Sequence, residues 1–187
     1  MEIVTRRFLL RDFTEAERPA FLAYQTDPRL LAFHGPDDAG PEQARRLFQT
    51  FQDWAAEQPR RNYQLAILRR EEPHTLVGCC GVRRAGCEDG KAELGIELAP
   101  EFWGRHGYAI EVGRALLAFG FGELGLEEIR GMTVSANARV QRLAEWFGAE
   151  VVAAHAGSPW MAERGWNEIE WRIPRERWER TAGHREA

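Results

Sequence analysis

The chain of 187 residues has few cysteines, no long apolar run and no surplus of basic charge. Cys79, Cys80 and Cys87 show no C-x-x-C spacing, so we expect reduced, partly buried thiols and no metal site. No run approaches the roughly 20 apolar residues that a membrane-spanning helix needs. The formal net charge of -4 argues against a nucleic-acid-binding protein, because such proteins usually carry a basic surface.

The composition is typical of a folded, water-soluble protein, with 44% hydrophobic and 29% charged residues. The length favours a single domain over residues 1–187, and breakers such as Gly35-Pro36 and Gly40-Pro41 are short enough to be loops. The first residues carry charges throughout and lack the apolar core of a signal peptide. We therefore expect a cytoplasmic protein without a membrane partner.

Hydrophobic periodicity and turn residues predict the order of the elements. Four helices are expected, opened by the capping box of Thr14 and Glu17, by Pro41, by Gly107, and by Ser135 or Asn137. The order β-α-α-β-β-β-α-β-α-β-β predicts an α+β fold around one central sheet. The predicted strands are Ile3–Arg11, Tyr63–Leu68, Thr75–Val82, Ala92–Leu98, Ile129–Val134, Glu150–His155 and Trp166–Ile173.

The segment from Ala92 to Ala109 carries the strongest functional signal. A strand ends in a turn that contains Gly104 and Gly107 and leads directly into a helix. Free amide groups at such a helix start favour the binding of a diphosphate, and Arg105 adds positive charge. A glycine in this kind of turn also occurs for steric reasons alone, so the turn by itself is weak evidence.

This segment resembles the fingerprint of the GNAT superfamily, especially of its Rim-type acetyltransferases. Glu93–Ala109 is similar to E-[IL]-G-x-x-[LI]-x-P-x-[YF]-W-G-[KR]-G-Y-A, with one extra residue in the turn. Thr5–Arg11 is similar to T-x-R-L-x-L-R, and Leu76–Gly78 to L-I-G. The positions that fit N-x-x-S-x-x-[VL]-x-x-x-x-G are Asn137, Leu143 and Gly148. The resemblance implies a GNAT-like mixed sheet with helices on both faces, and an acetyl-CoA-dependent N-acetyltransferase.

The resemblance also implies where acetyl-CoA, the cosubstrate, would bind. Its pantetheine arm would pair with the backbone near Glu97, Leu98 and Ala99 at the end of a strand. Asn137 would bond to the cofactor or the acceptor, although an Asn at this position is equally suited to cap a helix. The diphosphate would lie on the amides of Arg105, His106, Gly107, Tyr108 and Ala109.

Acetyl transfer to an amine needs a base, because only the neutral amine attacks a thioester. Glu93 is the first candidate, since several superfamily members carry a catalytic Glu at this strand position. Glu97 lies on the same face by two-residue alternation and is the second candidate. For His34 and His106 we expect surface or packing roles.

The acceptor is either a protein N-terminus or a small amine, and a homodimer is possible. Val140 and Ala144 replace the hydroxyl residues expected as general acid, which favours a non-catalytic acyl-CoA-binding or sensing module as the alternative. A free thiol titrates near pH 8.5, so a thiolate can leave without a dedicated acid. A dinucleotide-binding protein is disfavoured because the full G-x-G-x-x-G is missing.

Overall fold

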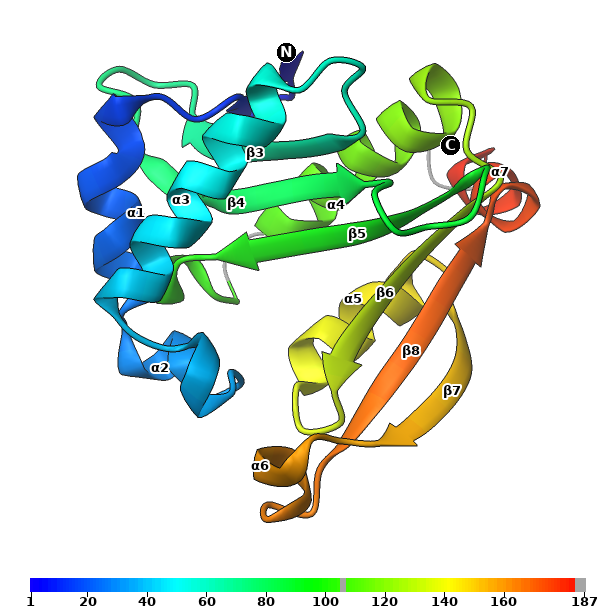
Figure 1. The fold of residues 1–187 in the computed structure, drawn as a ribbon. Helices are drawn as coiled ribbons and strands as arrows, with labels where there is room; N and C mark the ends of the chain where they lie inside the picture. The colour runs from blue at the N-terminus through cyan, green and yellow to red at the C-terminus, as the bar shows by residue number, and fades with distance from the viewer. Residues whose placement is uncertain (105–106, 184–187) are drawn as a thin grey trace.

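The strands form one eight-stranded sheet in the order β1-β2-β3-β4-β5-β6-β8-β7 (Figure 1). The computed structural model describes residues 1–104 and 107–183. Neighbouring strands are antiparallel except for β5 and β6, which run parallel, so the predicted mixed sheet is confirmed. The strands are β1 Glu2–Val4, β2 Phe8–Arg11, β3 Asn62–Arg69, β4 Leu76–Arg83, β5 Lys91–Leu98, β6 Glu128–Val134, β7 Glu150–Ala156 and β8 Asn167–Pro174.

Helices cover both faces of the sheet, with α1 and α3 on one face and α4 on the other (Figure 1). The α-helices are α1 Arg18–Gln25, α2 Pro28–Leu31, α3 Pro41–Ala56, α4 Tyr108–Ala118, α5 Ala138–Trp146, α6 Pro159–Ala162 and α7 Arg175–Gly183. Short 3-10 turns span Glu15–Glu17, Pro36–Asp38 and Pro100–Phe102, and a π-helical turn, Phe119–Glu123, continues α4. Within the described part of the chain, no helix has the length and apolar character needed to cross a membrane.

Two hydrophobic clusters hold these helices to the sheet. Phe21 of α1 and Phe48 of α3 are fully buried on one face, together with Leu68 of β3. Leu116 of α4 is fully buried on the other face, together with Ile67 of β3. Successive residues of a strand point to opposite faces, so β3 lies at the centre of both clusters. Burial of each of these large side chains contributes about 1.5–3 kcal/mol.

Most predicted elements are found within a few residues of their expected bounds. The capping box of Thr14 and Glu17 is present, with the Thr14 backbone N–H donating to Glu17 Oε2 at 2.8 Å. The Thr14 hydroxyl donates to the same oxygen at 2.8 Å. Asn137 caps α5, with its Oδ1 accepting from the Val140 N–H at 3.3 Å. The long helix predicted to start at Gly107 is α4 with its π-helical continuation.

The prediction of a single strand over Ile3–Arg11 is wrong. Two strands, β1 and β2, are joined by a turn in which the Thr5 N–H donates to the Phe8 carbonyl at 2.8 Å. The Thr5 hydroxyl and the Arg7 N–H both donate to Glu111 Oε1 in α4 at 2.7 Å. A carboxylate about 100 positions away thus stabilises a break that no local pattern indicates. The sequence patterns also do not predict α2, α6 and α7.

Gly78 of β4 lets the backbone of β4 lie against the C-terminal end of β5. An added β-carbon would lie 2.0 Å from the Glu97 carbonyl oxygen and 2.8 Å from Leu98 Cα. Gly78→Ala is therefore expected to lower the free energy of unfolding by about 1–3 kcal/mol, because backbone atoms must move. Chemical denaturation measures the loss. Gly122→Ala is the control, since its added β-carbon meets nothing within 4 Å, and equal losses in the two variants would contradict the explanation.

Candidate active site

β5 and β6 separate after three residue pairs, which join Lys91–Glu93 to Glu128–Arg130. Beyond this point the two strands diverge (Figure 1), and among the described residues β6 pairs only with β8. Residues of both strands line a cleft of about 980 Å³. Alternate peptide groups of a strand point toward each neighbour. From Leu94 onward the described β5 therefore has an edge without a strand partner, where an extended ligand can form backbone hydrogen bonds.

The start of α4 forms one wall of the cleft. Gly107 is the N-cap of α4, with φ of 69°, a left-handed conformation that glycine adopts without strain. Tyr108 and Ala109 follow in the first turn and line the cleft, where the first amide groups of a helix have no intrahelical acceptor. The predicted contacts of Arg105 and His106 lie outside the described residues.

The Tyr108 side chain has a structural role. It is 6% exposed, packs edge-on against Phe8 at a ring distance of 4.9 Å, and its hydroxyl accepts from Arg69 Nη2 at 2.6 Å. These contacts hold the Tyr108 side chain within the protein.

At the end of β5, Leu98 lines the cleft, whereas Ala99 is buried. The Leu98 carbonyl accepts from Trp103 Nε1 at 2.7 Å, and the Ala99 N–H donates to the Val77 carbonyl at 2.9 Å. The Ala99 N–H is thus already bonded within the sheet. The predicted backbone contact of Ala99 with a ligand would therefore compete with this bond, whereas the edge of the preceding residues of β5 has no strand partner.

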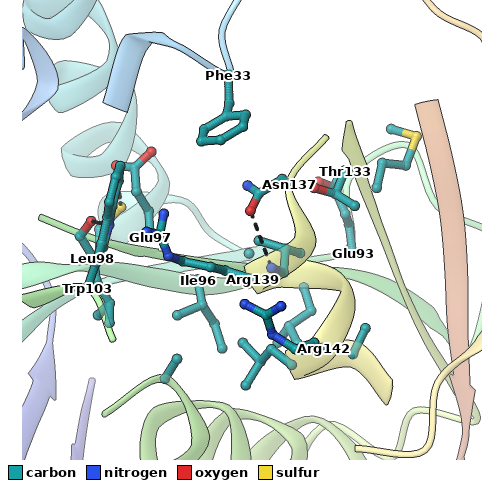
Figure 2. A pocket seen from close by; sticks show the side chains of 18 of the residues that line it. Phe33, Glu93, Ile96, Glu97, Leu98, Trp103, Thr133, Asn137, Arg139 and Arg142 are labelled. Atoms are coloured by element: carbon teal, nitrogen blue, oxygen red, sulfur yellow. Dashed lines mark hydrogen bonds between the residues drawn. The ribbon is translucent and has the colours of Figure 1, made fainter. Parts of the chain in front are cut away.

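Two arginines of α5 line the same cleft (Figure 2). The Arg139 guanidinium lies 5.0 Å from the centre of the Trp103 ring. Neither Arg139 nor Arg142 forms an ion pair with a carboxylate in the part of the chain that the structure describes. The sequence patterns do not single out these residues, although their spacing of three after the Asn137 cap places them on one helix face. They supply positive charge for an anionic ligand, and Asn137 itself lines the cleft beside them.

Glu93 lies where β5 and β6 begin to separate. Its Oε1 accepts from Arg83 Nη2 at 2.7 Å, and its side chain is 44% exposed. Glu93, which was predicted as a site residue, lines the cleft, but one of its oxygens is engaged in the ion pair with Arg83.

Glu97 lies toward the other end of β5, about 13 Å from Glu93 at the rise of a β-strand. Its Oε1 accepts from Gln25 Nε2 of α1 and from Cys79 Sγ of β4, the latter at 3.8 Å. Its Oε2 lies 3.9 Å from His34 Nε2. Burial raises the pKa of Glu97, and the charge of protonated His34 opposes this rise. The side chain keeps 25% exposure and lines the cleft.

His34 lines the cleft next to Glu97. The surface or packing role predicted for His34 did not include this position at the site. Gln25 and Cys79, which also surround Glu97, carry no local signal that would have selected them. They come from α1 and β4 and meet Glu97 only in the tertiary structure.

The cleft thus joins two chemically different regions. At the α4 and α5 side it offers a helix start, an open strand edge and two arginines, which suit an extended anionic ligand. At the α1 and α2 side it offers a carboxylate with a raised pKa next to a histidine. A ligand that binds through phosphate groups at the first region can therefore meet, within the same cleft, a second ligand that gives a proton to the carboxylate at the second region.

Comparisons with known proteins agree with this geometry. A family model described as an acetyltransferase (GNAT) domain matches residues 7–150. The chain is 31% identical over 140 residues to the uncharacterized N-acetyltransferase YoaA of Bacillus subtilis (strain 168), which is 74% of this chain and 77% of that protein. A GNAT-family acetyltransferase from Bacillus anthracis has a TM-score of 0.75 at 22% identity, over 94% and 99% of the two chains. A spermidine N-acetyltransferase from Vibrio cholerae, solved with CoA and spermine, has a TM-score of 0.72 at 15% identity, over 92% and 98%.

The chain belongs to the GNAT acetyltransferase family. The resemblance of the chain to the GNAT superfamily is confirmed, as is the GNAT fold. GNAT acetyltransferases use acetyl-CoA, and one of the similar structures holds CoA. At these identities the solved structures establish the fold alone.

Proposed function

We propose that this chain transfers the acetyl group of acetyl-CoA directly to a primary amine, carried by a protein N-terminus or by a small molecule. The observation that supports this function best is the continuity of the cleft. One cavity contains both the open edge of β5 beside the start of α4 and the partly exposed carboxylate of Glu97.

The described residues fit acetyl-CoA. The diphosphate would accept hydrogen bonds from the first amides of α4 beyond Gly107, where the helix dipole favours negative charge. Arg139 and Arg142 would add charge to the phosphate region, and the edge of β5 would bond to the amides of the pantetheine arm. Bound acetyl-CoA supplies the thioester that the amine attacks.

For the base, the geometry favours Glu97 over Glu93. Glu97 lines the cleft next to His34, and its raised pKa makes it a better proton acceptor than an ordinary carboxylate. Glu93 shares its charge with Arg83 at 2.7 Å. Glu93 stays a candidate for binding or orienting the reactants at the point where the strands part.

No hydroxyl residue is required to protonate the leaving sulfur. Val140 and Ala144 both line the cleft, so the positions expected to carry the acid are apolar. A thiolate is a stable leaving group near neutral pH, and solvent in the cleft can protonate it.

A thiol-release assay with acetyl-CoA and a panel of amines tests this function, with product mass as the second readout. We expect thiol release that depends on both the amine and the enzyme, and a product heavier by one acetyl group. Binding of acetyl-CoA by calorimetry without turnover of any amine would instead support the acyl-CoA-binding or sensing module. Absence of binding at millimolar acetyl-CoA would exclude both.

A further inference from the structure

The hydrogen bonds of His34 determine which of its ring nitrogens carries the proton. His34 Nδ1 lies 3.0 Å from the carbonyl oxygen of Leu30. A carbonyl oxygen only accepts, so Nδ1 is the donor of this bond. In the neutral ring Nε2 then has a free lone pair, and Nε2 is the nitrogen that faces Glu97 Oε2 at 3.9 Å.

The two oxygens of Glu97 have different surroundings. Oε1 receives hydrogen bonds from Gln25 and Cys79, whereas Oε2 faces His34. The separation of 3.9 Å exceeds the usual 2.7–3.2 Å of an N–H···O hydrogen bond. When His34 is neutral, two acceptors thus face one another across a gap at the wall of the cleft. An ammonium group, which has three N–H donors, can bond to both.

The walls around this gap are mostly apolar. Figure 2 shows Phe33 above the cleft, across from Glu97 and Asn137. The two other carboxylates that line the described cleft are Glu93, which is paired with Arg83, and Glu168 of β8. The apolar side chains on the α2 and α3 side are Leu30, Phe33, Leu47, Phe51 and Trp54. A second ammonium group on a ligand that extends toward α2 and α3 would lie among these side chains and lose its hydration, which is costly.

We infer that, given the proposed acetyl transfer, the acceptor is a primary monoamine with an apolar substituent, whose ammonium group is held between Glu97 Oε2 and His34 Nε2. The ammonium gives one proton to Glu97 Oε2 and becomes a neutral amine. Its nitrogen bonds to the thioester carbonyl carbon and loses a second proton, the C–S bond breaks, and the sulfur takes up one proton. The products are an acetamide, free CoA and one proton released to solvent.

The acceptor class is tested by comparing 2-phenylethylamine, ethanolamine and spermidine at saturating acetyl-CoA. We expect kcat/KM for 2-phenylethylamine to exceed that for ethanolamine by about tenfold or more, because the phenyl group buries apolar surface. We expect kcat/KM for spermidine to be lower than that for 2-phenylethylamine. Faster turnover of spermidine would overturn the monoamine class while leaving acetyl transfer intact, whereas no thiol release from any amine would count against acetyl transfer itself.

The role of His34 as a positioning residue is tested with His34→Asn, which keeps a donor for the Leu30 carbonyl but removes Nε2. We expect KM for the amine to rise about 10–100-fold, with kcat and the affinity for acetyl-CoA much less affected. His34→Gln places an acceptor near the former Nε2 and is expected to restore part of the loss.

His74→Asn is a matched control. His74 Nδ1 lies 2.8 Å from the Arg69 carbonyl, and its Nε2 lies 2.9 Å from Glu72 Oε1, but His74 is not among the residues of the cleft. This variant should keep the wild-type KM. An unchanged amine KM in folded His34→Asn would overturn the assignment of His34.

Discussion

Glu97→Gln is expected to lower turnover about 10²–10⁴-fold while the affinity for acetyl-CoA stays nearly unchanged. Glutamine keeps the size of the side chain and an acceptor for Gln25, but it cannot take a proton from the amine. Steady-state kinetics with saturating acetyl-CoA give the change in kcat, and calorimetry gives the affinity.

The pH profile provides a second readout for Glu97. Burial raises the pKa of this carboxyl, so wild-type activity should fall as the pH drops through a value above the ordinary range of a glutamate. The groups that face Glu97 are Tyr24 and Gln25 of α1, Cys79 of β4 and His34. In Glu97→Gln this inflection should disappear, and activity should rise steadily with pH as more of the amine becomes neutral.

Glu93→Gln is the control for the choice of base. It removes the same charge from the same face of β5, at the position that is paired with Arg83. If Glu93→Gln loses more turnover than Glu97→Gln, the base is Glu93 and the present assignment is wrong.

Folding is not expected to obscure the comparison. A carboxyl with a raised pKa in the folded state stabilises the protein at low pH, and this stabilisation is lost as the pH rises through that pKa. Glu97→Gln should therefore be at least as stable as the wild type at pH 8.

Gly107→Val is expected to weaken acetyl-CoA binding about 10–100-fold. The left-handed φ of 69° costs a residue with a side chain about 1–3 kcal/mol, and a β-branched side chain is among the least tolerant of it. The strain is relieved when the first turn of α4 changes its backbone conformation, which moves the amides from the cleft. Calorimetry with acetyl-CoA measures the effect.

Gly86→Val separates backbone strain from the loss of the binding site. Gly86 has φ of 81° in the turn before β5, its added β-carbon meets nothing within 4 Å, and it does not line the cleft. Gly86→Val should lower the free energy of unfolding without altering the affinity for acetyl-CoA. Equal affinity in folded Gly107→Val and in the wild type would exclude the start of α4 as the diphosphate site.

Local patterns in the sequence were enough to predict most of the fold. The meander of β3, β4 and β5 follows from apolar runs bounded by turns, and the Asn137 cap from a residue type and its place before a helix. Glu93 and Glu97 share the cleft because strand residues two apart, and hence four apart, point to one face. These features depend on interactions between residues that are close in the sequence, so their patterns can be recognised in a single sequence.

The sequence by itself thus determined the family, the order of the main helices and strands from α1 to β8 apart from the short α2 and α6, and the strand that carries both carboxylates. Only the tertiary structure decided which carboxylate is the less exposed, because Gln25, His34 and Cys79 reach Glu97 from segments up to 72 positions away. It also decided where β5 and β6 part and that Arg139 and Arg142 of α5 line the resulting cleft. Burial and charge at a site are sums over neighbours brought together by packing, and no local spacing records them.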